Sequence, residues 1–296
     1  MSSQRVPGRP QRGSRLRPEA SELAQGIASA RSVLFVPGDR PDRFPKAHAS
    51  GADEIVLDLE DAVAPDAKAQ ARENIRSWRA SEGKGVVRIN GPDSPWYDDD
   101  VAALADSPCA VALPKAASED EITALMGRLA AGSCVIPILE SAVGVLEARG
   151  ICAAAGVVRA AFGNADLASD LGVDPTDRTA LAHARAATVL ASAAGRLAPP
   201  LDGVTLALSD DELLRADAEH AAQLGFTGKL CIHPRQVAIV NELFSASPEE
   251  LAWAREIVAA AGDSVTVVDG QMIDKPLIDR ARRLLARAPV DVRAER

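Results

Sequence analysis

The sequence predicts a (β/α)8 barrel followed by a C-terminal extension. Eight short apolar runs rich in β-branched residues alternate with polar or Ala-rich stretches of helical spacing. This alternation is typical of parallel strands joined by right-handed crossovers. The repeats fill about 215 residues, which suits a barrel of this kind. A doubly wound open sheet is the alternative, but no strand is followed by a G-x-G-x-x-G turn and no G-x-x-x-x-G-K-[ST] loop exists.

Eight strands and several helices can be placed in order along the chain. The predicted strands are Ser32–Val36, Glu54–Leu59, Val86–Asn90, Ala110–Pro114, Cys134–Leu139, Val157–Phe162, Val204–Leu206 and Lys229–Ile232. The clearest helices between them are Asp66–Arg79, Glu119–Leu129, Arg178–Ala194 and Asp210–Leu224. Pro65, Ser118 and Ser209 stand directly before helices, where such residues favour helix starts. After the eighth strand, Pro234 begins a helix that runs to about Phe244.

Segments before and after the barrel complete the predicted organisation. The barrel occupies residues 31–245, and residues 246–296 form an extension made of a helix, a hairpin and a last amphipathic helix over about 277–288. The hairpin pairs Val265–Val268 with Gln271–Ile273 around Asp269–Gly270, a favoured turn dipeptide. Residues 1–30 carry five arginines and no apolar signal segment, which predicts a disordered arm. Contact of this arm with an anionic partner is the alternative.

Composition excludes several classes of protein. Apolar residues make up 47% and charged residues 25%, as in globular chains with a sizeable core. A net charge of −9 and only 3% aromatic residues argue against a nucleic-acid binder. No run of about 18 uncharged apolar residues exists, so no membrane span is expected. The four cysteines are scattered without a C-x-x-C pair, which favours a reducing, cytoplasmic location.

Polar side chains stand at the ends of most predicted strands. In a (β/α)8 barrel the carboxyl ends of the strands meet at one face, where catalytic groups lie. A charged group in that position is costly unless it is paired or liganded. The sequence therefore predicts a site at this face. The residues concerned are Asp58, Glu60, Asp61, Arg88, Asn90, Lys115, Glu140, Asn164, Asp166 and His233.

Glu140 and Asp166 are the predicted metal ligands. They follow neighbouring strands, and small residues beside them leave room for a ligand. Oxygen donors without a His–Cys cluster favour Mg²⁺ over zinc. Each acid alone could instead be a loop residue or a helix cap, and Asp58 could form a buried ion pair within the barrel.

A set of motifs in fixed order resembles a known family. The motifs are Arg31-Ser-Val-Leu-Phe-Val-Pro-Gly38, Asp58-Leu-Glu-Asp-Ala-Val63 with Pro65 and Lys68, Val87-Arg-Ile-Asn90, Leu113-Pro-Lys115, Ile138-Leu-Glu-Ser-Ala142, Phe162-Gly163 with Asp166-Leu167, and Ile232-His-Pro234. From about residue 31 to 290, the chain resembles the citrate lyase β-subunit-like (HpcH/HpaI aldolase) family, which includes malyl-CoA and citramalyl-CoA lyases. Asn164 and Ala165 depart from the acidic residues of some relatives, which leaves the acyl substrate open.

The resemblance implies roles for particular residues. Glu140 and Asp166 match Mg²⁺ ligands, and Glu60 and Asp61 match residues that hold metal-bound water. Arg88 matches the arginine that grips the substrate carboxylate or thioester oxygen. The remaining matches are to substrate contacts: Phe35, Arg40 and Lys46 at the CoA thioester or its phosphates, and Ala165, Ile232 and His233 at the barrel mouth. Arg40 and Lys46 could instead be surface charges, and His233 could cap a helix.

The extension resembles a lid. Its segment Gly270-Gln-Met-Ile-Asp-Lys-Pro276 implies that Asp274 is an acid/base group acting in a neighbouring subunit's site, although Asp274 could simply cap the next helix. A lid that serves a neighbour implies a homo-oligomer, as a trimer or hexamer.

The implied activity is cleavage of a carbon–carbon bond beside a thioester, or the reverse condensation of a CoA thioester with a 2-oxoacid. A short 3-hydroxy-dicarboxyl-CoA such as malyl-CoA or citramalyl-CoA is the expected substrate, with Mg²⁺ as cofactor. Three alternatives stay open: a citrate lyase β subunit that acts on an acyl-carrier-protein thioester, a thioester hydrolase, and a free-acid aldolase.

Overall fold

A closed barrel of eight parallel strands forms the centre of the molecule. A computed structural model describes residues 22–81, 83–260, 266–268 and 271–286. The strands pair in chain order, and the last pairs back to the first. They are β1 (Ser32–Pro37), β2 (Glu54–Asp58), β3 (Val86–Arg88), β4 (Ala110–Leu113), β5 (Cys134–Leu139), β6 (Arg159–Phe162), β7 (Ala198–Asp202) and β8 (Gly228–Cys231). The predicted barrel fold is confirmed.

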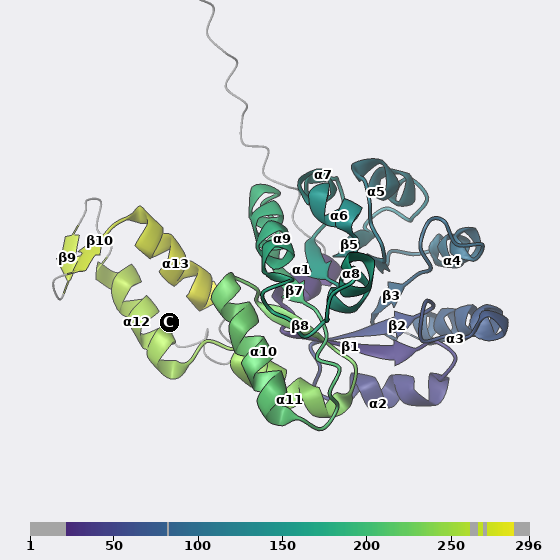
Figure 1. Cartoon of the computed structure of the whole chain (residues 1–296), viewed down its shortest axis with the longest axis horizontal. Helices are drawn as coiled ribbons and strands as arrows, with labels where there is room; N and C mark the ends of the chain where they lie inside the picture. The colour runs from purple at the N-terminus through teal and green to yellow at the C-terminus, as the bar shows by residue number, and fades with distance from the viewer. Residues whose placement is uncertain (1–21, 82, 261–265, 269–270, 287–296) are drawn as a thin grey trace, which may run out of the picture.

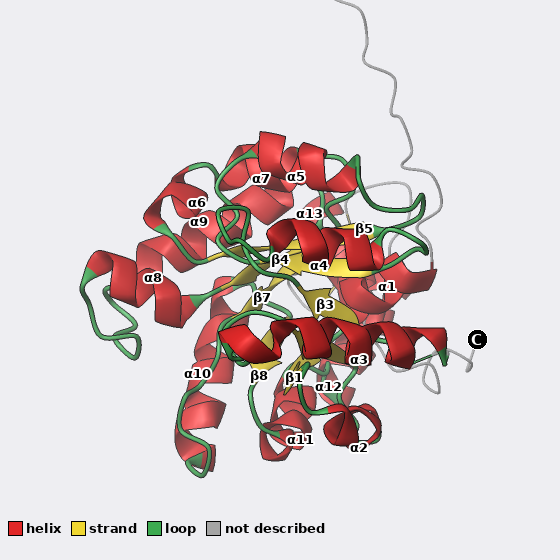
Figure 2. Cartoon of the chain, turned by 90° about the vertical axis from the view of Figure 1, so that its right-hand side faces the viewer, coloured by secondary structure: helices red, strands yellow, loops and turns green. Residues whose placement is uncertain are grey.

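Helices surround the strands on the outside of the barrel, as Figure 2 shows. They are α2 (Phe44–His48), α3 (Lys68–Ala80), α4 (Tyr97–Leu104), α5 (Glu119–Met126), α6 (Ala142–Leu146), α7 (Ala148–Ala153), α8 (Asn164–Leu171), α9 (Ala182–Ala194), α10 (Asp211–Leu224) and α11 (Pro234–Leu243). Two short 3₁₀ turns, Pro41–Arg43 and Pro65–Ala67, precede α2 and α3. Alternate strand residues fill the barrel interior, and the other face of each strand packs against these helices.

The seventh strand differs from its prediction. It spans Ala198–Asp202, whereas the sequence analysis placed it at Val204–Leu206. Pro199 and Pro200 have no N–H group, so this stretch does not resemble a strand in sequence. The pairing of β7 with β6 shifts register around these prolines, which accommodates them. The apolar run 204–206 is part of the loop that follows the strand.

The N-terminal boundary also differs from its prediction. Residues 22–29 form helix α1 (Glu22–Ser29), although a disordered arm was predicted through residue 30. Ile27 is 1% exposed and packs into the apolar cluster of the barrel interior. Fully buried Arg159, at the start of β6, donates hydrogen bonds to the carbonyls of Ile27 and Ala30. Helix α1 therefore covers the N-terminal end of the barrel, and residues 1–21 lie outside the described residues.

The C-terminal extension folds largely on itself. Helices α12 (Pro248–Ala260) and α13 (Lys275–Ala286) bury Ala254, Ile257 and Ala281 between them. Strands β9 (Thr266–Val268) and β10 (Gln271–Ile273) pair antiparallel, which confirms the predicted hairpin, while its turn at 269–270 lies outside the described residues. Figure 1 shows this unit projecting beyond α10 and α11. None of the described helices is long and apolar enough to span a membrane.

Replacing Glu54 with glutamine is expected to stabilise the protein above pH 7. Glu54 begins β2 beneath α1, and burial together with neighbouring Asp53 raises its pKa to about 7. The folded protein therefore holds this proton more tightly than the unfolded chain, so stability falls as the pH rises from the ordinary carboxyl pKa through 7. Glu54→Gln removes this loss, and we expect a gain of about 1–3 kcal/mol in the free energy of unfolding at pH 8.

Urea unfolding of both proteins between pH 4.5 and 8 measures this difference. The gain in the free energy of unfolding should shrink toward zero at pH 4.5, because the Glu54 carboxyl of the folded protein is then protonated and uncharged, as glutamine is. Glu219→Gln, an exposed position on α10, is the control and should change stability little at any pH. A constant difference between the Glu54 variant and the wild type across this range would contradict the assignment.

Candidate active site

Arg88 and Asp58 form a buried ion pair at the carboxyl ends of β2 and β3. The Arg88 Nε and Nη2 atoms donate to the two carboxylate oxygens of Asp58 at 2.7 and 2.6 Å. Asp58 is fully buried, and it also accepts hydrogen bonds from the backbone N–H groups of Glu60 and Ala62. The guanidinium lies over the Phe35 ring at 4.7 Å. The paired geometry fixes the Arg88 plane and leaves Nη1 at an ion-pair distance of 3.0 Å from Glu60 Oε2, without a hydrogen bond between them.

Lys115 connects three carboxylates around the barrel mouth. Its backbone N–H donates to Glu140 Oε1 at 2.8 Å, and its Nζ lies 2.8 Å from Glu60 Oε1 and 3.4 Å from Asp166 Oδ1. Lys115 has a φ of 52°, a left-handed conformation that costs a non-glycine residue about 1 kcal/mol. Lys115 stands at the end of a predicted strand, but no role for it could be predicted from the sequence. The structure makes it the link between the predicted metal ligands.

Negative charge exceeds positive charge in this cluster. Burial, reinforced by the carboxylates of Glu60 and Asp166, raises the pKa of Glu140 to about 8. Burial also raises the pKa of Glu60, although Arg88 and Lys115 oppose this rise. Among the described groups none donates a hydrogen bond to Glu60 Oε2, which is buried. Five acids therefore face three cations, because Lys68 also interacts with some of the acids that meet Arg88 and Lys115. The acids are Asp58, Glu60, Asp61, Glu140 and Asp166.

The donor set fits a hard divalent cation. Glu140 and Asp166 present carboxylate oxygens to one cavity, and an added positive charge would offset the excess of acids. Within the described ranges, no three His, Cys, Asp or Glu side chains converge on a point as a complete ligand shell. Mg²⁺ commonly takes one or two carboxylates and fills its other positions with water and substrate oxygens. The arrangement suits an ion of that kind.

Gly163 makes room for the buried carboxylate of Glu140. A Cβ atom at residue 163 would lie 2.4 Å from the Glu140 Cβ and 2.5 Å from its Oε2. Contacts this short are not tolerated without movement of one partner. The glycine between β6 and α8 therefore lets the end of β5 approach closely, and it holds Glu140 near Asp166.

Two adjoining hollows contain most of the predicted site residues. The first has a volume of about 430 Å³, and its lining includes Phe35, Arg88, Glu140, Ala165, Asp166 and Ile232. The second, of about 560 Å³, shares Phe35, Pro37 and Ile232 with the first. Its polar lining consists of Arg40, Asp42, Arg43, Lys46 and His233. An acidic chamber thus opens beside a predominantly basic one, and Arg43 is a basic residue that the sequence analysis did not select.

Residues 31–234 match the HpcH/HpaI aldolase/citrate lyase family, and residues 191–291 match a C-C bond lyase of the TIM-barrel fold. The chain belongs to the HpcH/HpaI aldolase/citrate lyase family. The expected resemblance is confirmed.

Relatives within the HpcH/HpaI family cover nearly the whole barrel and extension. A (3S)-malyl-CoA thioesterase of Cereibacter sphaeroides is 38% identical over 87% of this chain and 94% of its own length. A citrate lyase subunit beta-like protein of Mycobacterium tuberculosis is 39% identical over 88% of this chain and 96% of its own. The crystal structure of CitE from M. tuberculosis with magnesium, acetoacetate and coenzyme A has a TM-score of 0.76 and 36% identity, and it covers 88% of this chain and 99% of that one.

His233 and Asp274 both act as helix caps in this family member. His233 Nδ1 accepts a hydrogen bond from the Arg235 N–H at 3.2 Å at the start of α11, and the imidazole also borders the basic chamber. Asp274 Oδ1 accepts from the Leu277 N–H at 3.1 Å at the start of α13. Asp274 is not in the lining of either chamber of its own chain. The structure therefore does not bring it to the other predicted site residues within one subunit.

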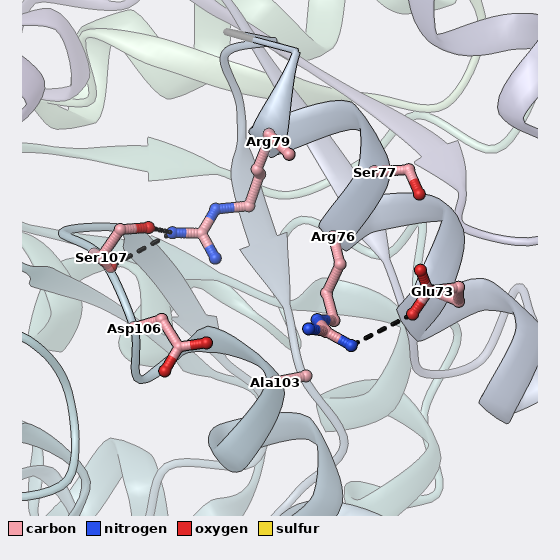
Figure 3. A pocket seen from close by; sticks show the side chains of 8 residues that line it. Glu73, Arg76, Ser77, Arg79, Ala103, Asp106 and Ser107 are labelled. Atoms are coloured by element: carbon pink, nitrogen blue, oxygen red, sulfur yellow. Dashed lines mark hydrogen bonds and ion pairs between the residues drawn. The ribbon is translucent and has the colours of Figure 1, made fainter.

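A further hollow of about 290 Å³ lies on the outside of the barrel, between α3 and the segment that follows α4 (Figure 3). Its two arginines already have partners. Arg76 pairs with Glu73 at 3.2 Å, and Arg79 donates to Ser107 Oγ at 2.8 Å. None of the predicted site residues lines it. Most of the predicted site residues instead line the two chambers at the barrel mouth.

Gly163→Ala is expected to weaken Mg²⁺ binding by about tenfold or more, because the added methyl group displaces the Glu140 carboxylate. Isothermal titration with MgCl2 measures the affinity. Gly150→Ala in α7 is the matched control, since the nearest atom to its new Cβ lies 3.8 Å away, and it should bind Mg²⁺ as the wild type does. Unchanged affinity in a folded Gly163→Ala protein would contradict the ligand role of Glu140.

Proposed function

We propose that this protein is a Mg²⁺-dependent carbon–carbon lyase, or the corresponding condensing enzyme, that acts on a short 3-hydroxy-dicarboxyl-CoA such as malyl-CoA or citramalyl-CoA. The observation that carries this proposal is the meeting of Glu140, Asp166 and Arg88 in one cavity, with Lys115 joining the two acids. Membership of an aldolase and lyase family supports it. The magnesium and coenzyme A in the related CitE structure support the cofactor and the thioester.

The metal-binding acids and Arg88 have different parts in this reaction. Glu140 and Asp166 would hold Mg²⁺, which supplies Lewis-acid polarisation of the hydroxyl and carboxylate oxygens of the substrate when it is bound. Arg88, held by Asp58, would donate to the thioester carbonyl oxygen, where negative charge develops as the carbon–carbon bond breaks. Because Asp58 and Phe35 already fix the guanidinium, little reorganisation is needed when this charge appears.

Proton transfer completes the bond cleavage. A base removes the proton of the 3-hydroxyl group, the electron pair of the breaking bond passes to the thioester α-carbon, and that carbon then takes up a proton. The products are a 2-oxoacid and acetyl-CoA or its homologue. On the resemblance of the extension to the family's lid, we assign the acid/base role to Asp274 of a neighbouring subunit. Asp274 lies outside both chambers of its own chain. This assignment requires a homo-oligomer, as a trimer or hexamer, in which the α12–α13 unit acts as a lid.

The basic chamber would hold the CoA portion. Arg40, Arg43 and Lys46 place three cationic side chains around a hollow that adjoins the acidic chamber. Arg40 is 3.3 Å from Asp42, so part of its charge is offset before a ligand binds. Phosphate groups of CoA would interact with these side chains while the acyl end reaches Arg88.

Thioester hydrolysis is the second candidate function. The observation that favours it is the 38% identity with a protein named (3S)-malyl-CoA thioesterase. Hydrolysis of malyl-CoA would release free CoA and malate, whereas cleavage would release a 2-oxoacid and leave the thioester intact. The two products therefore distinguish the candidates.

Malyl-CoA and citramalyl-CoA, each supplied with and without Mg²⁺, test the proposed function directly. We expect 2-oxoacid release, trapped as a hydrazone, only with Mg²⁺ present, and little free thiol. Glu140→Gln and Asp166→Asn should each lower turnover by about a hundredfold or more, because they remove ligand charge. Asp170→Asn, one turn along α8, keeps an oxygen that can accept from the Ala142 N–H and is the control. If neither malyl-CoA nor citramalyl-CoA is turned over with Mg²⁺ present, the proposal is contradicted.

Asp274→Ala is expected to lower turnover by about a hundredfold while changing Mg²⁺ affinity little, because it removes a proton carrier and not a ligand. Mixed oligomers sharpen this test. Subunits carrying Asp274→Ala, when reassembled with subunits carrying Glu140→Gln, should recover part of the activity, since some sites then combine an intact metal centre with an intact lid. No recovery in verified mixed oligomers would argue against action between subunits, and equal losses of turnover and Mg²⁺ affinity would exclude an acid/base role.

A further inference from the structure

One side of the acidic chamber is apolar. Val204, Leu206 and Ile232 line the same cavity as Glu140 and Asp166. Leu206 is 49% exposed and Ile232 is 36% exposed, which is unusual for large apolar side chains unless they meet a ligand or a partner. We call these three residues the apolar wall. They come from the loops after β7 and β8, across the barrel from Arg88 on β3.

The segment that carries the wall is anchored at its start by buried charges. Asp202 Oδ1 accepts from Arg185 Nε at 2.9 Å, and its Oδ2 accepts from Lys229 Nζ at 3.1 Å. Burial alone would raise the pKa of Asp202, but Lys229 and Arg185 outweigh this effect and hold the pKa below its ordinary value. Lys229 Nζ also donates to the Gly203 carbonyl at 2.7 Å. Residues 202 and 203 are therefore fixed to α9 and β8 at once.

Asn164 holds the next residue by a pair of hydrogen bonds. Its Nδ2 donates to the Val204 carbonyl at 3.1 Å, and its Oδ1 accepts from the Val204 N–H at 2.8 Å. Asn164 is 5% exposed and lies two residues before Asp166 in α8. The approach is close enough that a Cβ at Gly203 would lie 2.1 Å from Asn164 Oδ1. The amide thus ties the apolar wall to the helical turn that carries a predicted metal ligand.

Gln236 connects the two loops that form the wall. Its Nε2 donates to the Thr205 carbonyl at 2.9 Å, and its Oε1 accepts from the Ile232 N–H at 2.9 Å. Gln236 is 2% exposed, so these hydrogen bonds are shielded from water. Side chains of other elements thus bond the backbone of Gly203, Val204 and Thr205, and they pair with the Asp202 side chain. The backbone that leads into the wall is therefore held in place before any ligand binds.

We propose that Asn164 is a positioning residue that sets acyl-chain preference, and that the site takes 2-oxoacids, and the hydroxyacyl groups formed from them, that carry an alkyl substituent. This inference rests on the proposed function. The carboxylate and carbonyl oxygens of a 2-oxoacid would face the Mg²⁺ that Glu140 and Asp166 would hold. The substituent on its oxo carbon then points to the remaining side of the 430 Å³ cavity, where the apolar wall lies. Each buried methylene group should strengthen binding.

Binding of a homologous series tests this inference. Isothermal titration of the Mg²⁺-loaded full-length protein with pyruvate, 2-oxobutanoate and 2-oxopentanoate should give affinities that rise about three- to fivefold per added methylene. Asn164→Ala should flatten the series while leaving pyruvate affinity and Mg²⁺ affinity within about threefold, because it frees the wall but removes neither a metal ligand nor Arg88. Asn241→Ala is the matched control. Its Nδ2 donates to the Gly51 carbonyl at 2.8 Å near the N-terminal end of the barrel, and its series should match the wild type.

Gly203→Ala tests the same contact from its other side. The added methyl group would displace the Asn164 amide, so this variant should flatten the series as well, and the double variant should show no further loss. Equal affinities of the wild type for all three acids would overturn the inference. Equal loss of all three acids in Asn164→Ala would also overturn it, because the residue would then serve the metal centre.

The outcomes separate this inference from the proposed function. If the affinity of the wild-type protein rises along the series of 2-oxoacids but the protein cleaves no thioester, the role of the apolar wall is supported and the lyase function is contradicted. If the protein cleaves malyl-CoA but binds the three 2-oxoacids equally well, the lyase function is supported and the role of the apolar wall is contradicted.

Discussion

Like charge gathered in a small buried volume is the constraint that shapes the mouth of this barrel. Glu60, Glu140 and Asp166 lie around one lysine side chain, and the structure must hold them against mutual repulsion. The Asp58–Arg88 pair, the left-handed backbone of Lys115 and the absent side chain at Gly163 all serve this purpose. An excess of negative charge held in fixed positions lowers the stability of the fold. Such a loss of stability is typical of sites that bind a cation.

The other end of the barrel carries contacts that stabilise the fold. There, Ile27 of α1 packs into the barrel interior, and Arg159 donates hydrogen bonds to the backbone carbonyls of Ile27 and Ala30 in an apolar setting. This division of labour is common in (β/α)8 barrels, where the carboxyl face carries function and the amino face supports the fold. It explains why a helix is found in part of the segment that composition assigned to a disordered arm. The helix contributes only two or three apolar residues, but they fill the barrel end.

The sequence could predict the barrel and much of its site because a strand end is a local feature. Glu140, Asp166 and Arg88 each follow an apolar run, and the parallel topology brings such ends together. Contacts across the barrel could not be predicted in this way. Lys115 meets Glu140 and Glu60 from 25 and 55 positions away, and no local pattern marks that convergence. The position of strand β7 was predicted wrongly because Pro199 and Pro200 are unusual within a strand. The pairing of β7 with β6 accommodates them by a shift of register.

Misplacing that strand also concealed the apolar wall. If residues 204–206 belonged to a strand, Val204 and Leu206 would share one face, and they would be expected to pack in the core of the barrel. As a loop pinned at Asp202 and Val204, the segment instead presents both side chains to the cavity. Buried ion pairs therefore support both sides of the mouth, Asp58–Arg88 beside the acids and Asp202–Lys229 behind the wall. A ligand that is polar at one end and apolar at the other would be oriented by these two fixed surfaces, since reversing it would place alkyl carbon against carboxylates and oxygen against leucine.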